Sequence, residues 1–324
     1  MTSSRAWSLV RARQRHHRAL RLWRAGRLAD AQRCIVRAIA GYAGTEPAGV
    51  DRAGTEPAGV ERAGTGRAER AGALLTLADF QFQLARFGDA ETTLREAVRL
   101  LDGAPPRQRV DALVRLANSQ RRQGRLDAAE ATARAALSHA AAIPVLLAEA
   151  NNAVGVVLKD AGRYAEAAGH YTAALTPATD PDLAASVHHN LAGLAHAEGR
   201  FADAVAPAGL ALALHRREHG PQSTEVAADC AVLGAVLLEL GRLAEAEAHL
   251  HQAYRIWADR FGPDHYEVGV CLHGLGVARL RRGDLPGARR SLDEALRIKT
   301  AVLGPDNAGI AALRRNVAAL ASSR

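Results

Sequence analysis

Small and apolar residues recur along this chain in a pattern that predicts pairs of helices. Seven segments share a turn residue, an apolar residue two positions later, and alanines five and twelve positions later. Alanines seven residues apart lie on one face of a helix and allow a second helix to approach closely. Each segment is therefore predicted to be a helical hairpin that needs its neighbours to cover its apolar faces. The seven turn positions are Gly26, Ala85, Gly124, Gly162, Gly199, Gly241 and Gly283.

A second apolar set precedes each turn, with a small residue such as Gly234 or Gly276 at its centre. A glycine at the turn supplies the chain reversal between two helices. We therefore predict an all-α solenoid of about seven hairpins with no strand. The last segment, 308–324, is too short for a further hairpin and is predicted to be a single capping helix.

This pattern resembles the tetratricopeptide repeat, with its small residue in the first helix, its turn glycine and the two alanines of the second helix. The resemblance covers nearly the whole chain outside 43–70 and implies a right-handed α-solenoid. The later steps between turns lengthen to 42 residues, and "FGPDHYEVGVCLHGLGVARL" resembles the longer repeats of kinesin light chains. Members of this repeat family typically hold peptides in the concave groove lined by the first helices.

The first step between turns is longer than the others because a ten-residue unit is duplicated within it. "AGTEPAGVDR" is followed by "AGTEPAGVER", and removing these twenty residues shortens the step from 59 to 39. Glycine and proline recur in the unit while only a valine is available to bury, so we expect a disordered loop over 43–70. The alternative is that the segment is a ligand motif. The expected organisation is a first hairpin over 1–42, this loop, six further repeats over 71–307, and the capping helix.

Positive charge is concentrated in the first hairpin. The formal net charge is +8, yet residues 1–42 hold ten arginines and a single acid, Asp30, so the rest of the chain sums to about −1. Such asymmetry indicates either the solvated face of a terminal helix or a surface for nucleic acid or an anionic membrane. Aromatic side chains do not alternate with these arginines as base stacking would require, which disfavours nucleic acid as a partner.

Membrane spans, a secretory signal and paired cysteines would each indicate a cellular compartment, and none is predicted here. No run of about 18 apolar residues predicts a membrane span, and the basic N-terminus has no apolar core of a secretory signal. The cysteines, Cys34, Cys230 and Cys271, are odd in number and lack paired spacing. We expect reduced thiols in a cytoplasmic protein.

Catalytic and cofactor motifs are not expected in this chain. "HRREH" at 215–219 matches a metalloprotease string, but His219 occupies the register position of Phe261 and Leu303, which predicts a packing role. The two lysines follow apolar residues, so there is no phosphate-binding loop. We therefore expect no enzyme activity, no metal and no cofactor.

Binding is expected in the groove, at positions ten, six and three residues before each turn. Asparagine, arginine, lysine and histidine side chains there suit the amides and carboxylates of an extended peptide, and leucines continue the surface. The alternative is a hydrated groove without a ligand. Val114 and Ala153 stand where a chaperone-type carboxylate clamp needs polar residues, so chaperone tails are not the expected ligand. The candidate contacts are Asn118, Arg121, Asn152, Lys159, His189, His196, Leu238 and Leu280.

The predicted function is a non-enzymatic scaffold that binds another protein or an acidic peptide in this groove. The alternative is an adaptor that binds nucleic acid or an anionic surface through the arginine-rich first hairpin.

Overall fold

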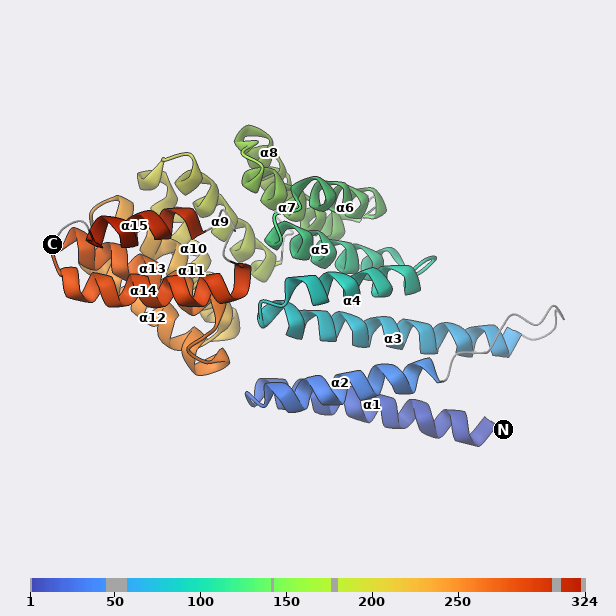
Figure 1. Ribbon diagram of the computed structural model, residues 1–324. Helices are drawn as coiled ribbons and strands as arrows, with labels where there is room; N and C mark the ends of the chain where they lie inside the picture. The colour runs from blue at the N-terminus through green and yellow to red at the C-terminus, as the bar shows by residue number, and fades with distance from the viewer. Residues whose placement is uncertain (1, 45–56, 141–142, 176–179, 305–309, 322–324) are drawn as a thin grey trace. The chain divides into compact units, whose positions relative to one another are not determined.

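The computed structural model describes residues 2–44, 57–140, 143–175, 180–304 and 310–321. Within these residues the chain forms fifteen helices and no strand, which confirms the all-α prediction (Figure 1). The helices are α1 Thr2–Arg24, α2 Leu28–Ala43, α3 Pro57–Gln83, α4 Phe87–Leu100, α5 Pro106–Arg122, α6 Leu126–His139, α7 Pro144–Asp160, α8 Tyr164–Ala174, α9 Pro181–Ala197, α10 Phe201–His219, α11 Thr224–Glu239, α12 Leu243–Phe261, α13 Tyr266–Arg281, α14 Leu285–Leu303 and α15 Ala311–Ala321.

The helices follow one another as seven pairs and a final single helix, as the repeat pattern predicts. The chain divides into two compact units, Met1–Val157 and Leu158–Arg324. Within the first unit α1 packs on α2, α3 on α4 and α5 on α6, and each hairpin packs on the next. Within the second unit α9 packs on α10, α11 on α12 and α13 on α14 in the same way.

The alanines that recur at the same spacing in each repeat mark the contacts between helices. All fourteen alanines at the two shared positions have no exposed surface. The facing helices also come close at their small residues. A β-carbon added at Gly234 would lie 2.7 Å from Leu250 Cγ, and one at Gly276 would lie 2.6 Å from Leu292 Cγ. The prediction of close helix packing at these positions is therefore confirmed. The alanines are Ala31, Ala90, Ala129, Ala167, Ala204, Ala246 and Ala288, with Ala38, Ala97, Ala136, Ala174, Ala211, Ala253 and Ala295.

The turn residue of every hairpin adopts a left-handed backbone conformation. The six glycines have φ between 72° and 80°, and Ala85 takes the same conformation with φ 57°. This conformation is accessible to glycine and strained for residues with a β-carbon. A second set, Gly220, Gly262 and Gly304, ends α10, α12 and α14 with positive φ, and its members are 42 residues apart.

The expected loop over 43–70 is wrong in its second part, because α3 begins at Pro57. Proline is accepted in the first turn of a helix. The third, partial copy of the duplicated unit supplies side chains that attach this helix to its neighbours: Glu69 pairs with Arg13 of α1, and Arg70 pairs with Glu96 of α4 at 2.6 Å. The second hairpin therefore begins before residue 71. Most of the duplicated segment, residues 45–56, lies outside the described residues.

The final helix α15 covers the last hairpin of the second unit. Leu313 and Leu320 are buried against Ala288, Leu292 and Ala295 of α14. This packing agrees with the predicted capping helix, although the helix starts at Ala311 and residues 305–309 and 322–324 are outside the described residues. Across the described part of the chain, no helix has both the length and the apolar character needed to cross a bilayer.

Candidate functional site

The first unit holds three of the predicted groove residues. Asn118 and Arg121 lie one turn apart on α5, and Arg121 donates from Nε and Nη2 to Asn118 Oδ1 at 3.1 and 2.8 Å. Asn152 lies on α7 and is half-buried. Arg121 and Asn118 thus form a polar pair whose geometry is fixed within the protein, and any ligand of Arg121 must share the guanidinium with Asn118.

The second unit holds two further polar groove residues, Lys159 and His196, and a glycine, Gly193, lies between them. A β-carbon added at Gly193 on α9 would lie 3.8 Å from Lys159 Nζ, so the ammonium group stands over a stretch of helix without a side chain. Lys159 pairs with Asp160 at 3.1 Å. Burial, together with the charge of Lys159, lowers the pKa of His196 although Glu239 opposes the shift. The lowered pKa favours the neutral form of the His196 imidazole beside the Lys159 cation.

His189, two turns before His196 on α9, is held by a buried carboxylate that sequence reasoning missed. His189 Nδ1 lies 2.7 Å from Oδ1 of Asp229 on α11, and His215 Nδ1 of α10 lies 2.7 Å from Oδ2 of the same group. The Asp229 side chain has no exposed surface, whereas 28% of the His189 side chain is exposed. The carboxylate thus fixes the ring of His189 and leaves its Nε2 atom as the nitrogen available to a ligand.

The charge of Asp229 is stabilised inside the helix layer by these two histidines. Burial alone would raise the pKa of Asp229, but the hydrogen bonds and charges of His189 and His215 lower it below its usual value. For His215, burial lowers the pKa and the contact with Asp229 outweighs it, aided by Asp182 and Glu225, so the pKa of His215 is raised. The trio forms only where three consecutive helices of two neighbouring hairpins pack together, which is why spacing along the sequence did not reveal it.

His219 continues this chain of contacts but not as the packed residue that its register predicted. Its Nε2 atom lies 2.5 Å from Asp182 Oδ1, and 36% of its side chain is exposed. Asp182 also lies 3.7 Å from His215 Nε2. Across the described residues, no group of three His, Cys, Asp or Glu side chains is arranged to hold a metal ion.

The two leucines expected to extend the groove offer less surface than predicted. Leu238 is only 5% exposed, because it packs in the core around Leu233, Leu237 and Cys271. The neighbouring α13 also lies against this point, where Arg281 donates to the Leu238 carbonyl. Leu280 is half-buried against the cluster that includes Leu313 and Leu320 of the final helix.

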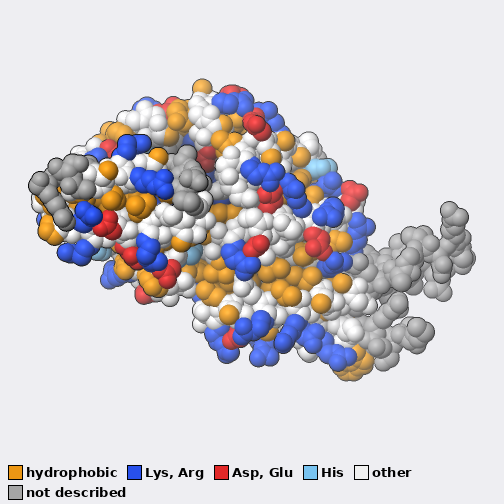
Figure 2. Space-filling view, viewed as in Figure 1, with side chains coloured by type: hydrophobic (Ala, Val, Ile, Leu, Met, Phe, Trp, Pro, Cys, Tyr) orange, Lys and Arg blue, Asp and Glu red, His pale blue; other side chains and the backbone are white. Residues whose placement is uncertain are grey.

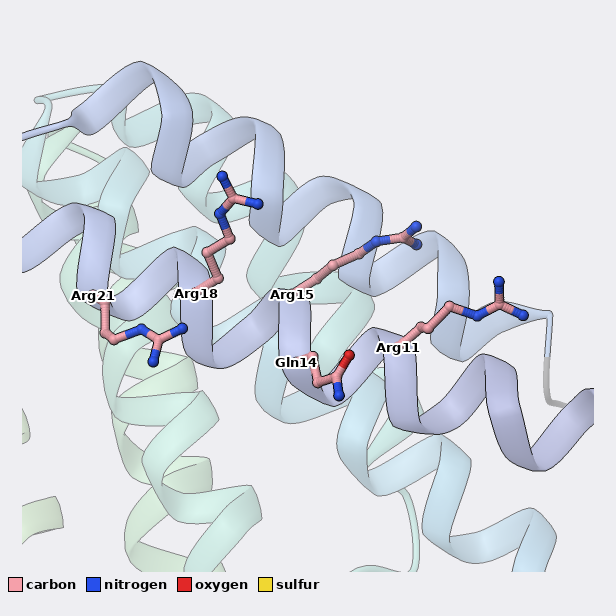
Figure 3. A pocket seen from close by; sticks show the side chains of 5 residues that line it. All are labelled: Arg11, Gln14, Arg15, Arg18 and Arg21. Atoms are coloured by element: carbon pink, nitrogen blue, oxygen red, sulfur yellow. The ribbon is translucent and has the colours of Figure 1, made fainter.

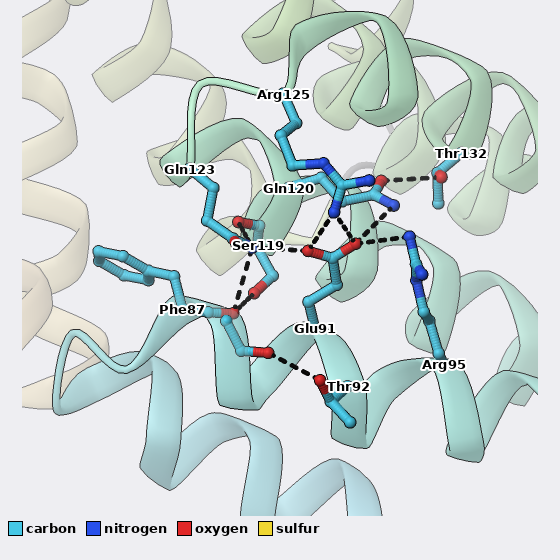
Figure 4. A network of polar contacts seen from close by, with 10 residues as sticks. Phe87, Glu91, Thr92, Arg95, Ser119, Gln120, Gln123, Arg125 and Thr132 are labelled. Atoms are coloured by element: carbon cyan, nitrogen blue, oxygen red, sulfur yellow. Dashed lines mark hydrogen bonds and ion pairs between the residues drawn. The ribbon is translucent and has the colours of Figure 1, made fainter. Parts of the chain in front are cut away.

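A second polar network lies where the second and third hairpins meet, and it too was missed (Figure 4). The Glu91 carboxylate accepts from Gln123 Nε2 at 2.8 Å and pairs with Arg125 at 2.6 Å and Arg95 at 2.7 Å. Burial would raise the pKa of Glu91, but hydrogen bonds from Gln123 and Gln120 and the arginine charges lower it. These contacts join α4 to α5 and α6, so we assign the network to packing between hairpins.

Family models of the tetratricopeptide repeat match residues 75–145, 114–184, 185–225 and 227–301. These matches take in all of 75–301 except residue 226. The chain belongs to the tetratricopeptide-repeat family. The family models do not separate the kinesin light chain-type repeats from the others, so that resemblance remains a prediction.

Solved structures with a similar fold are also tetratricopeptide solenoids at low sequence identity. A tetratricopeptide repeat protein from Parabacteroides merdae is 14% identical, with a TM-score of 0.52 over 95% of this chain and 98% of that one. The apo form of RapI is 11% identical, with a TM-score of 0.56 over 95% and 99% of the two chains. A multidomain signal-transduction ATPase with a tetratricopeptide sensor, from Pyrococcus horikoshii, is 11% identical with a TM-score of 0.55.

That alignment covers 89% of this chain and 42% of the ATPase, so the likeness concerns only part of the larger protein. No curated protein matches the sequence significantly. The tetratricopeptide repeats support a protein-interaction scaffold as the class of function, and the solved structures show the fold.

Proposed function

We propose that this tetratricopeptide-repeat protein is a non-enzymatic scaffold whose second unit binds an extended segment of a partner carrying a carboxylate. The surface around Gly193 carries the proposal. On α9, His189 and His196 lie on either side of Gly193 at intervals of one turn, and Lys159 Nζ stands over the missing side chain. A bare backbone beside fixed polar groups is a place where a peptide can approach closely.

The polar groups of this surface suit a peptide carboxylate. Lys159 supplies the cation. It pairs with Asp160, the next residue in the sequence, whose side chain is 29% exposed. His189 Nε2 and His196 supply hydrogen bonds to peptide amides and carbonyls. Because Asp229 fixes His189 in advance, little conformational entropy is lost when that contact forms.

Asn118, Arg121 and Asn152 provide a second set of polar side chains in the first unit. The Asn118 amide and the Arg121 guanidinium suit backbone carbonyls and carboxylates. We propose this set as a separate contact for the partner. Leu238 is left out of the proposed contacts because it is buried, and Leu280 contributes only its exposed edge.

The proposal is tested with an array of unstructured peptides in which each sequence carries either a free or an amidated C-terminus. We expect the wild-type protein to select acidic peptides or free C-termini. Lys159→Ala should weaken the selected peptides about tenfold or more, since a hydrogen bond to a charged group contributes about 1.5–3 kcal/mol. Arg121→Ala tests the separate contact in the first unit by the same measurement.

The control is Arg242→Ala, which removes an exposed cation from the turn before α12 in the same unit. That variant should keep the peptide affinity. Undiminished binding by Lys159→Ala would exclude this surface, and an array without selected peptides would contradict peptide binding altogether.

A further inference from the structure

One face of the first helix carries a row of arginines that form no ion pair with any acid among the described residues. Arg11, Gln14, Arg15, Arg18 and Arg21 line a hollow of about 460 Å³ along α1 (Figure 3). All five are exposed. They span eleven residues of one helix, from 11 to 21, or about 15 Å along its axis. In the space-filling view, blue side chains gather along the edge formed by α1 and α2 (Figure 2).

These four arginines differ from three other arginines of the first hairpin, which form ion pairs. Arg13 pairs with Glu69, and Arg27 and Arg33 both pair with Asp30. Within the described residues, the arginines that line the hollow form no ion pair, and Arg11 donates only to the Trp7 carbonyl at 3.4 Å. Turn arginines of later repeats, such as Arg86 and Arg242, pair with an acid three residues on. Within the described residues, the charge of this row on α1 therefore has no ion-pair partner, unlike that of the turn arginines.

The apolar residues of α1 show which partner the face suits. Ala12, Ala19, Leu22 and Trp23 are buried, so the helix has no free apolar stripe with which to enter a bilayer. Trp7 and Val10 are 62% and 40% exposed at the N-terminal end of the arginine row. Tryptophan and arginine are enriched among the residues that contribute most to the affinity of protein interfaces.

The extent of the charge also separates the candidate partners. Nucleic-acid binding commonly uses six to ten phosphate contacts, and outside residues 1–42 the chain has a net charge of about −1. A row four arginines long fits a short anionic segment better. Glutamates at intervals of three and four residues on a helix have the same axial spacing as Arg11, Arg15, Arg18 and Arg21.

We propose that this face of α1 binds an acidic helical segment of a partner protein, with Trp7 and Val10 covering apolar residues at one end. This surface is independent of the one proposed around Gly193.

The test uses the full chain and a fluorescent helical peptide with glutamates at these intervals and leucines at one end. Arg15→Gln/Arg18→Gln/Arg21→Gln removes three charges with a residue that is well tolerated in helices. The matched control, Arg86→Gln/Arg163→Gln/Arg242→Gln, removes three charges from paired arginines at the turns. Each exposed ion pair contributes little by itself, but the loss of three together should make the first triple variant bind about tenfold more weakly. The control should bind the peptide like the wild type. Trp7→Ala, as a separate variant, should also weaken peptide binding.

A single-stranded oligonucleotide and phosphatidylserine vesicles serve as the competing probes at the same salt concentration. Equal losses in the two triple variants would show a general charge effect and overturn the site. Tight binding of the oligonucleotide or vesicles, without binding of the glutamate peptide, would overturn the acidic-protein assignment. Circular dichroism and a melting curve establish that both variants remain folded.

Discussion

Single residues determine how each hairpin turns, and Ala85 is the position where this chain departs from its own pattern. Six turns place glycine in the left-handed region, and the second turn places alanine there with φ 57°. A β-carbon in this conformation costs about 1–2 kcal/mol. The turn still forms because Arg86 N donates to the Gln81 carbonyl at 2.8 Å and the hairpin packs on both sides.

We predict that Ala85→Gly stabilises the protein by about 0.5–1 kcal/mol, since relief of strain exceeds the larger entropy of glycine in the unfolded chain. The reverse change at an equivalent turn, Gly124→Ala, should destabilise it by about 1 kcal/mol. Urea denaturation of both variants measures the difference. A lower midpoint for Ala85→Gly would show that the turn is not strained.

Asp229 is the residue whose effect on stability should depend most on pH. The raised pKa of His215 stabilises the fold at low pH, and this contribution is lost as the pH rises through the raised value. The lowered pKa of Asp229 has the opposite sign, because its contribution is complete above 3.8 and is lost as the pH falls through the lowered value. Both contributions are therefore present between 3.8 and 6.5.

We predict that Asp229→Asn destabilises the protein by about 1–3 kcal/mol at pH 6 and by less at pH 8. The charged groups near the two histidines, Asp182 and Glu225, remain in the variant. Melting curves of wild type and variant at the two pH values give the comparison. A penalty that is equal at both values would mean that His215 does not titrate against this carboxylate.

Helices in this protein approach one another most closely where alanine or glycine lies at the contact. Ala246 and Ala253 of α12 are fully buried, and Gly234 of α11 lies close to Leu250 and the Ala246 carbonyl. The two alanines lie two turns apart on one face, so this face sets the distance between α12 and its neighbours. Polar networks such as that of Glu91 then join one hairpin to the next.

Ala246→Leu or Ala253→Leu should overpack this contact and destabilise the protein by about 1–3 kcal/mol. Ala248→Leu is the control, because residue 248 is exposed on the same helix. The denaturation midpoint should fall for the buried substitutions and stay close to the wild-type value for the control. Wild-type midpoints for all three would place the packing face elsewhere on α12.

For the molecule as a whole, periodicity along the sequence was enough to predict seven hairpins, their turns and the capping helix. The spacing of turn residues and alanines is a local feature of the sequence, so each of the seven repeats displays it. The start of α3 at Pro57 was missed because ion pairs of Glu69 and Arg70 with other helices attach that segment. The contacts of Glu91 and Asp229 were missed for the same reason, since their partners come from other helices.

The candidate surface was predicted only in part, because position within a repeat does not determine exposure. Lys159, His189 and His196 remain at the proposed surface, whereas Leu238 is covered by the packing of α13 and the core. The short distance between Lys159 Nζ and the backbone at Gly193 was not predicted, because it depends on a contact between residues far apart in the sequence.

The most direct test is to fill the space over Gly193 and measure peptide binding by calorimetry. The ligand is the tightest peptide from the array, and the variants are Gly193→Leu and the control Gly169→Leu. No atom lies within 4 Å of a β-carbon added at Gly169 on α8, whereas Lys159 Nζ lies 3.8 Å from one at Gly193. We predict that Gly193→Leu stays folded and raises Kd at least tenfold, while Gly169→Leu leaves Kd unchanged. A folded Gly193→Leu protein with the wild-type Kd would contradict binding at this surface.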